Sequence, residues 1–316
     1  MTNQLNYPAA FLASGVLFLA ACGGGGGGGT SAALAPAPAA PAVAASGGPL
    51  SFQPDNTTVS YQPASATALV TNAGVGGVAA AASGQGATIT VTASGGAYTV
   101  VFNIPTTGTT FTQQFSEGAY DYGGIIGNLP NTAQFAAMLS QIFGFPNTNG
   151  AVITQSAGAQ TLNYAAYGLW ASGDTTTAGR AGTLAFGNLT PTASVPATGS
   201  ATFNGTTIGV GGATSGSTVY ALQGNAQIVA NFATQSVTTN LTNLGTQNIS
   251  TNATGSLPNL TGTSTISGNA YAGPIAGTGL SGTINGNFYG SNAQETAGVW
   301  QATGGGNSWI GSYAAK

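Results

Sequence analysis

From Leu50 to its C-terminus the sequence consists mainly of short stretches in which apolar and polar residues alternate, and glycine separates one stretch from the next. An alternation with a period of two gives a β-strand one apolar and one polar face. The pattern is clearest over residues 87–104, where two alternating stretches flank a Ser-Gly-Gly segment that is typical of a hairpin turn. A further strand is predicted over residues 109–115. The fold class is therefore expected to be mainly β.

One segment has the spacing of a helix instead. In residues 131–145 the apolar side chains recur three or four positions apart, and Asn131 or Thr132 can cap the first turn. Pro146 and the Asn-Thr-Asn-Gly stretch that follows it break the chain. We therefore expect one short helix and a boundary here, with a small β-rich domain over residues 50–150 and a second domain over residues 151–316. The apolar residues at helical spacing are Phe135, Met138, Leu139 and Ile142.

The second domain is predicted to be a succession of short strands with no long helix between them. Such regular spacing is typical of an antiparallel meander. Strands rich in Thr, Asn and Gly specify their pairing register poorly in an open sheet, and closure into a barrel removes the exposed edges. We therefore expect an antiparallel up-and-down barrel. The predicted strands cover residues 160–170, 182–186, 199–208, 217–223, 226–232, 237–241, 261–271, 280–288, 298–302 and 308–313.

The N-terminus carries the features of a bacterial export signal. Residues 11–21 form an apolar run that is too short to span a bilayer, which takes about 20 residues, but that suits the apolar core of a signal peptide. The run ends in Leu-Ala-Ala-Cys, which resembles the lipobox, where the cysteine thiol accepts diacylglycerol and the peptide before it is removed. Cys22 is the only cysteine in the chain and cannot form an intrachain disulfide. We predict a lipoprotein signal peptide over residues 1–21 and a lipid anchor at Cys22, with an ordinary signal peptide and an unmodified cysteine as the alternative.

A tether is predicted between this anchor and the first strand. Residues 23–29 are all glycine, and Ala-Pro repeats continue to about residue 49. Such a segment cannot bury enough apolar surface to offset its ordering entropy, so residues 22–49 are expected to be disordered. No Asp follows Cys22, which in bacterial lipoproteins favours transport to the outer membrane. We therefore expect the chain to be lipid-anchored in the outer membrane and exposed at the cell surface.

Ionisable side chains are scarce, and their scarcity excludes several classes of function. Only 2% of the residues are charged, and the only basic side chains are Arg180 and Lys316. A nucleic-acid-binding protein needs several Lys or Arg residues to neutralise phosphates, so nucleic acid is not expected as a partner. The chain has no histidine, which excludes the Ser-His-Asp triad, zinc sites that use histidine and histidine-ligated haem. No cofactor is predicted.

The acidic side chains do not suggest a catalytic or metal site. Glu117 and Asp121 lie four residues apart, but a solvated loop is favoured over a pair of glycosidase carboxylates because no helix fixes their separation. A calcium site at Asp121 or Asp174 would lack the regularly spaced acids of a calcium-binding loop. No catalytic or metal-binding residue is therefore predicted, and the chain is not expected to be an enzyme.

The final part of the sequence resembles a specific family. The segment from Gly286 to Trp300 is similar to the G-x-F-Y-G-x-x-A-x-E-x-x-G-V-[FW] motif of the β-barrel domain of transferrin-binding protein B and related lipoproteins. Three upstream segments match in the same order, and the ending from Trp309 to Tyr313 also fits. The resemblance covers about half of the chain, from Tyr164 to the C-terminus. The upstream segments are residues 164–170, 190–205 and 224–232.

The resemblance implies an eight-stranded, water-soluble barrel that is filled by side chains and carried on a lipid tether. The glycines of the motif permit close approach of the strands, and four large side chains are expected inside the barrel. We expect Glu295 to lie in a turn, where its carboxylate accepts hydrogen bonds from backbone amides. The four large side chains are Phe288, Trp300, Trp309 and Tyr313.

Relatives in this family bind host iron proteins, haem or other solutes at the cell surface, so the resemblance implies a binding function. This chain has room for one barrel rather than two lobes, and it lacks charged surface loops, so transferrin is not expected as its ligand. We predict capture of a solute or a protein partner at the outer membrane, with an outer-membrane receptor or a lipoprotein-exporting translocon as a further partner. The alternatives are a structural or adhesive surface lipoprotein without a small-molecule ligand, and a transmembrane barrel.

Overall fold

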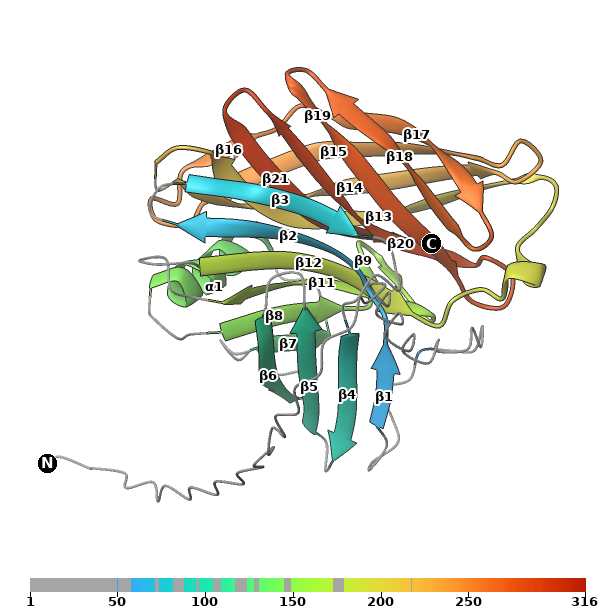
Figure 1. The fold of residues 1–316 in the computed structure, drawn as a ribbon, viewed down its shortest axis with the longest axis horizontal. Helices are drawn as coiled ribbons and strands as arrows, with labels where there is room; N and C mark the ends of the chain where they lie inside the picture. The colour runs from blue at the N-terminus through green and yellow to red at the C-terminus, as the bar shows by residue number, and fades with distance from the viewer. Residues whose placement is uncertain are drawn as a thin grey trace, which may run out of the picture. The chain divides into compact units, whose positions relative to one another are not determined.

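Strands make up most of the described part of the chain, which confirms the mainly β fold (Figure 1). The signal peptide and tether predicted over residues 1–49 lie outside the described residues. The structure is a computed structural model, and it describes residues 50, 58–71, 74–81, 88–94, 97–104, 109–116, 124–127, 131–144, 149–172, 179–216 and 218–316.

Eight strands, coloured yellow to red in Figure 1, form a closed antiparallel barrel. Each strand pairs with the next one along the chain, and the last, β21 (Asn307–Ala315), pairs with the first, β13 (Ser200–Ala213). This closure removes both edges of the sheet and confirms the predicted eight-stranded up-and-down barrel. A short strand, β16 (Thr254–Ser256), is added to β15. The remaining barrel strands are β14 (Val219–Asn231), β15 (Ser236–Asn248), β17 (Leu260–Ser267), β18 (Ala270–Gly277), β19 (Leu280–Tyr289) and β20 (Glu295–Gly304).

Three predicted stretches divide the chain differently from the observed strands. Residues 160–170 were expected to be one strand of the barrel domain, but they contain the short strand β10 (Gln160–Thr161), a break and the first part of β11 (Ala165–Ser172). The strand predicted over residues 182–186 is β12 (Gly179–Gly187), and both β11 and β12 belong to a separate sheet and not to the barrel. Residues 217–223 and 226–232 were expected to be separate strands, but β14 runs through both with an irregular register between Gln223 and Asn225. Residues 261–271 were expected to be one strand, but they contain the turn between β17 and β18, where Gly268 has a φ of 63°. Alternation did not separate the last two cases, because a bulge and a tight turn both appear in a sequence as a glycine within an alternating stretch.

Aromatic rings inside the barrel lie against glycines of the neighbouring strand. Trp300 and Gly311 are register partners on β20 and β21, and so are Trp309 and Gly211 on β21 and β13. A Cβ atom on Gly311 would lie 2.3 Å from the Trp300 ring, and one on Gly211 would lie 2.4 Å from the Trp309 ring. The glycines therefore leave the space that the rings occupy. A further pair of this kind is formed by Tyr271 and Gly286.

The four large side chains predicted to fill the barrel are all buried in its core, which confirms the prediction. Phe288 lies at the centre of an aromatic group, with ring centroids of three neighbours 5.3–6.2 Å from its own. Such contacts add about 0.5–1.5 kcal/mol each beyond the burial of area. The three neighbours are Phe203, Phe232 and Tyr271.

The residues before the barrel form two further sheets. The six-stranded sheet has the order β3-β2-β12-β11-β8-β7, and the four-stranded sheet has the order β1-β4-β5-β6. The hairpin predicted over residues 87–104 is β4 paired with β5, and the strand predicted over residues 109–115 is β6. The strands are β1 (Thr58–Tyr61), β2 (Ala64–Thr71), β3 (Gly74–Ala81), β4 (Thr88–Ser94), β5 (Ala97–Ile104), β6 (Thr109–Ser116), β7 (Gly124–Gly127), β8 (Asn149–Thr154), β11 (Ala165–Ser172) and β12 (Gly179–Gly187), with β9 (Ser156–Ala157) and β10 (Gln160–Thr161) as a small separate hairpin.

The six-stranded sheet joins strands from both sides of residue 150. Residue 150 lies inside β8, β8 pairs with β11, and β12 pairs with β2. Residues 149–187 thus continue a sheet that begins at Ala64, whereas the first barrel strand begins at Ser200. We propose the connection over residues 188–199 as the boundary between the sheet region and the barrel.

Helix α1 (Thr132–Gly144) confirms the predicted helix and its cap. The backbone N–H of Gln134 donates to Oδ1 of Asn131 at 3.0 Å, and the backbone N–H of Asn131 donates to Oε1 of Gln134 at 3.0 Å. This reciprocal pair is a capping box. Phe135, Met138 and Leu139 on the apolar face of the helix join the core. Within the described ranges, no helix combines the length and the apolar character that crossing a membrane requires.

One wall of the barrel is covered by the six-stranded sheet. Side chains that point outward from β13, β20 and β21 are apolar and buried, and they pack in one core with side chains of β2, β11 and β12. The hydroxyl of Ser312 on β21 also donates to the carbonyl of Gly168 on β11 at 2.8 Å. We call this surface the covered wall. Its apolar members are Ile208, Val210, Ala297, Val299, Ile310 and Ala314.

Candidate functional site

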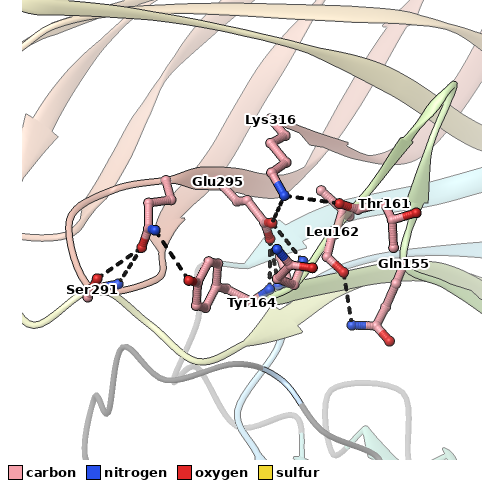
Figure 2. A network of polar contacts seen from close by, with 10 residues as sticks. Gln155, Thr161, Leu162, Tyr164, Ser291, Glu295 and Lys316 are labelled. Atoms are coloured by element: carbon pink, nitrogen blue, oxygen red, sulfur yellow. Dashed lines mark hydrogen bonds and ion pairs between the residues drawn. The ribbon is translucent and has the colours of Figure 1, made fainter.

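Glu295 is a fully buried carboxylate where the barrel meets the segment before β11 (Figure 2). Its Oε1 atom accepts a hydrogen bond from the backbone N–H of Asn163 at 2.6 Å. Its Oε2 atom accepts from the backbone N–H groups of Tyr164 and Ala165 at 2.9 and 3.0 Å. The prediction that this carboxylate accepts backbone amides is confirmed. The residue begins β20, paired with Tyr289, rather than lying in a turn, because the ladder between β19 and β20 extends to it.

Lys316 and the turn before β20 complete this network (Figure 2). The Lys316 ammonium lies 3.5 Å from Oε1 of Glu295 and donates to the carbonyl of Thr161 at 3.2 Å. The Gln294 amide donates to the Tyr164 hydroxyl at 3.2 Å, and its Oε1 atom accepts from the backbone N–H and the hydroxyl of Ser291 at 2.9 and 3.0 Å. The start of β20, the end of β21 and the segment before β11 are therefore tied together.

The contacts of this junction are made by groups of the chain itself. Three backbone amides donate to the Glu295 carboxylate, and the Lys316 ammonium lies 3.5 Å from its Oε1 atom. Of the five acidic residues, Glu295 alone lies in the described part of the chain, and Asp55, Glu117, Asp121 and Asp174 lie outside it. The described residues therefore contain no carboxylate pair.

Phenol groups inside the barrel also serve packing. The Tyr271 hydroxyl lies 2.7 Å from the Tyr313 hydroxyl and 2.6 Å from Oγ1 of Thr296. Burial raises the pKa of Tyr271 to about 12, although these hydrogen bonds act in the opposite direction. Burial also raises the pKa of Tyr313 well above its ordinary value. Both phenols are therefore protonated at neutral pH and contribute hydrogen bonds rather than charge.

Part of the barrel exterior carries amide and hydroxyl groups without a charge. Asn204 on β13 pairs with Gln227 on β14, which pairs with Asn240 on β15, which pairs with Thr261 on β17. The Gln227 amide donates to Oδ1 of Asn204 at 3.1 Å, and the Asn240 amide donates to Oε1 of Gln227 at 3.4 Å. A row of polar side chains thus crosses four strands of the barrel.

A hollow of about 500 Å³ lies along this row. A second row, one step along the strands, borders it and includes Asn225 and Thr242, which are register partners, and Asn259. No ionisable side chain lines the hollow. We call this surface the open wall. Its members are Asn204, Asn225, Gln227, Asn240, Thr242, Asn259 and Thr261.

A second hollow, of about 430 Å³, lies near the connection that leads into the barrel. The short helix η2 (Thr192–Ser194) contributes Thr192 to one side, and the turns between barrel strands contribute Thr234 and Gly268 to the other. Its apolar surface comes from Val195 and Phe232, among others, and it also lacks ionisable side chains. Two uncharged hollows are thus present on the described barrel.

Cys22, for which the sequence predicts acylation, lies outside the described residues, so its acylation stays a prediction. No ligand-binding residue was predicted, and the open wall was missed. A signal for it is present, because Asn and Gln occur at outward positions of three predicted strands. The register that aligns Asn204, Gln227 and Asn240 is a long-range property, which alternation does not determine.

Comparison with known proteins identifies the barrel. Residues 195–316 match the family model described as the C-lobe and N-lobe β barrels of Tf-binding protein B. The match contains all eight barrel strands and the closing motif from Gly286 to Trp300, whereas the upstream segment over residues 164–170 lies outside it. A comparison with curated protein sequences finds no match.

Several solved structures are similar to this chain, among them the following three. Transferrin-binding protein B, isotype 1, from serogroup B Neisseria meningitidis is 21% identical, with 49% of this chain and 31% of that chain covered and a TM-score of 0.37. This chain therefore spans about a third of the length of that protein. A mutant of transferrin-binding protein B from Actinobacillus pleuropneumoniae H49 is 14% identical, with 80% and 99% covered and a TM-score of 0.41. A structure described as a surface lipoprotein is 13% identical, with 80% and 98% covered and a TM-score of 0.39.

The family match agrees with the strand pairing and with the packed interior, both of which were established independently of it. The resemblance seen in the closing motif is confirmed. Residues 195–316 match the model of the transferrin-binding protein B barrels, and the residues before 195 lie outside that match.

Proposed function

We propose that this chain is a surface lipoprotein of the outer membrane that binds a solute or a protein partner through its barrel and carries out no chemical reaction. The observation that supports the proposal most strongly is the family match of residues 195–316, because the family is one of binding proteins. The lipobox-like sequence that ends at Cys22 supports attachment to a membrane through a lipid.

The chemistry of the described residues supports binding rather than catalysis. The sequence has no histidine, and the one carboxylate in the described part of the chain is held by three backbone amides and by Lys316. General acid–base catalysis needs a group that can exchange a proton with a bound substrate. The buried phenols of the barrel interior do not supply one at neutral pH, since burial raises the pKa of Tyr271 to about 12.

We do not propose for this chain the binding partner that is named for the similar proteins. Two of the similar structures are described as transferrin-binding proteins. Both hollows on the barrel of this chain lack ionisable side chains, so a partner bound there is held by hydrogen bonds and apolar contact instead of salt bridges. We therefore propose an uncharged solute or a weakly charged protein surface as the partner.

The anchor is tested by changing Cys22 to Ala. The native chain is expected to incorporate labelled palmitate and to fractionate with the outer membrane, because three acyl chains hold a protein firmly. The Cys22→Ala variant is expected to take up no label and to leave that fraction. A native chain without label, distributed like the variant, would show that the anchor is wrong.

Partner capture is tested with a photoreactive amino acid in place of Gln227, which is exposed on the open wall. Cells that carry this variant are irradiated in their own growth medium, and the adducts are identified by mass spectrometry. A matched variant places the same group at Gln301, whose amide donates to Thr283 on β19 at 3.3 Å and does not border the hollow. We expect an adduct at position 227 and none at position 301. Equal labelling at both positions, or none, would favour a structural or adhesive role.

A further inference from the structure

The open wall has unused hydrogen-bonding capacity. A carboxamide offers two N–H donors and a carbonyl oxygen with two lone pairs. In the row across the strands, Gln227 and Asn240 each use one donor within the row. Among the described residues, the side chains of Asn225, Asn259 and Thr242 make no hydrogen bond. The hollow therefore presents donors and acceptors side by side that are available to a ligand.

The arrangement of these groups narrows the chemistry of the ligand. Without an ionisable side chain, the hollow offers nothing to compensate a carboxylate, a phosphate or an ammonium group. The remaining lining residues, Gly205 and Ala226, are small, so the hollow has no aromatic or large aliphatic side chain to pack against a hydrophobic ligand. A neutral ligand rich in hydroxyl groups matches both properties, because each hydroxyl donates one hydrogen bond and accepts others.

The spacing of the row favours an oligomer over a single sugar ring. Neighbouring strands lie about 4.8 Å apart, so the four-strand row spans about 14 Å. The row has one residue on each of the four strands β13, β14, β15 and β17: Asn204, Gln227, Asn240 and Thr261. A chain of linked hexoses presents hydroxyl groups at a repeat close to the strand spacing, so successive rings can bond to successive strands.

We propose that the open wall binds a neutral oligosaccharide, with the carboxamides of Gln227, Asn240 and Asn225 as hydrogen-bonding groups. This inference rests on the proposed binding function and names the ligand class. Each contact is exposed to water and therefore weak, so binding depends on several rings engaging together.

The test uses the full-length chain purified in detergent and three neutral probes: maltotetraose, cellotetraose and triacetylchitotriose. Saturation-transfer NMR detects binding, and titration gives the affinity. We expect at least one neutral probe to bind saturably, and an acidic probe, tetragalacturonate, not to bind. Failure of all three neutral probes to bind at millimolar concentration, or preference for the acidic one, would overturn the inference.

Two variants locate the site. Gln227→Ala is expected to weaken binding of the neutral probe about tenfold, because it removes two or more hydrogen bonds. Gln301→Ala removes an exposed cross-strand amide of the same kind and is expected to leave the affinity unchanged. Thermal unfolding of both variants must match the native chain, which separates loss of binding from loss of fold.

Equal affinity in the native chain and Gln227→Ala would place any sugar binding elsewhere and overturn the inference. Concentration-dependent dimerisation that Gln227→Ala abolishes would also overturn it, since the open wall would then bind a second copy of this chain. Neither result bears on the acylation of Cys22, which is tested separately, and the identity of the photo-adduct at position 227 distinguishes a second copy of this chain from another partner.

Discussion

The covered wall and the open wall belong to the same barrel, share the same alternation and differ only in what their outward side chains are. The covered wall carries Ile310 and Val299, which are buried against the six-stranded sheet. The open wall carries Gln227 and Asn240, which pair with each other across two strands and face solvent. Inward side chains are large and apolar on both, as Trp300 and Ile228 illustrate.

The outward residues of the covered wall stabilise the fold, whereas the outward residues of the open wall are available for binding. A closed barrel with a packed interior does not need its outer surface for stability, so outward residues are constrained only where another element covers them. The covered wall is therefore expected to be intolerant of substitution, and the open wall tolerant. Four predictions test this comparison.

The largest difference is expected between Ile310→Ala and Asn240→Ala. Ile310 has no exposed surface and packs in the core between the two sheets, so its truncation should lower the free energy of unfolding by about 3 kcal/mol. Asn240→Ala removes a partly exposed amide and should change it by less than about 0.5 kcal/mol. Urea unfolding followed by tryptophan fluorescence measures both. Similar losses from the two variants would contradict the distinction between the walls.

Glu295→Gln should lower the free energy of unfolding by about 2–3 kcal/mol, because an amide replaces a carboxylate that accepts three backbone hydrogen bonds and turns a donor toward them. Lys316→Met is the matched control on the other side of the ion pair. The Lys316 side chain is 35% exposed, so water replaces much of what it loses, and the cost should stay below about 1 kcal/mol. A larger cost for Lys316→Met than for Glu295→Gln would mean that the ion pair, and not the amides, holds the junction.

Gly311→Ala should cost about 2 kcal/mol, because its Cβ atom would lie 2.3 Å from the Trp300 ring, which is itself enclosed in the core. Gly245→Ala on β15 is the control. The nearest atom to its Cβ is the carbonyl oxygen of Gln223 at 3.8 Å, so this change should be nearly neutral. Chemical unfolding of the two variants compares them. A neutral Gly311→Ala would show that the ring does not rest on this glycine.

The last effect is absent at neutral pH and appears only in alkaline solution. The pKa of Tyr271 is about 12 in the folded chain and about 10 when the chain is unfolded, so the unfolded chain loses this proton first. The contribution to stability is complete below pH 10 and is lost as the pH rises toward 12, at up to about 1.4 kcal/mol per pH unit. Tyr271→Phe should reduce the alkaline slope by that amount, and Gln227→Ala on the open wall should leave it unchanged. An unaltered slope in Tyr271→Phe would mean that this phenol titrates alike in both states.

Much of this architecture could be predicted from the sequence where the signal is local. Alternation predicted the hairpin of β4 and β5, and a capping residue with helical spacing predicted α1. The interior residues Phe288 and Trp300 were predicted because the closing motif combines large rings with glycines. In each case, the determining residues are neighbours in the chain or belong to one short motif.

Features that depend on distant pairing could not be predicted in this way. The partnership of β2 with β12 joins Ala64 to Ala185, and no local pattern indicates that these two segments meet. The same is true of the backbone amides of residues 163–165 that hold Glu295, which are about 130 residues away from it in the chain. The open wall required the register of four strands, which is fixed by the closure of the barrel.

Cysteine labelling on intact cells, with a maleimide that does not cross membranes, tests most directly whether the chain is lipid-anchored and presents its open wall at the cell surface. Acylation of Cys22 would leave the native chain without a free thiol, because it is the only cysteine. Gln227→Cys places a thiol on the open wall, and Ser312→Cys places one on the covered wall, where Ser312 has no exposed surface. We expect Gln227→Cys to be labelled on intact cells, Ser312→Cys to be labelled only after denaturation, and the native chain not at all. Labelling of the native chain, or protection of Gln227→Cys until the cells are lysed, would contradict a lipid-anchored protein that presents its open wall at the cell surface.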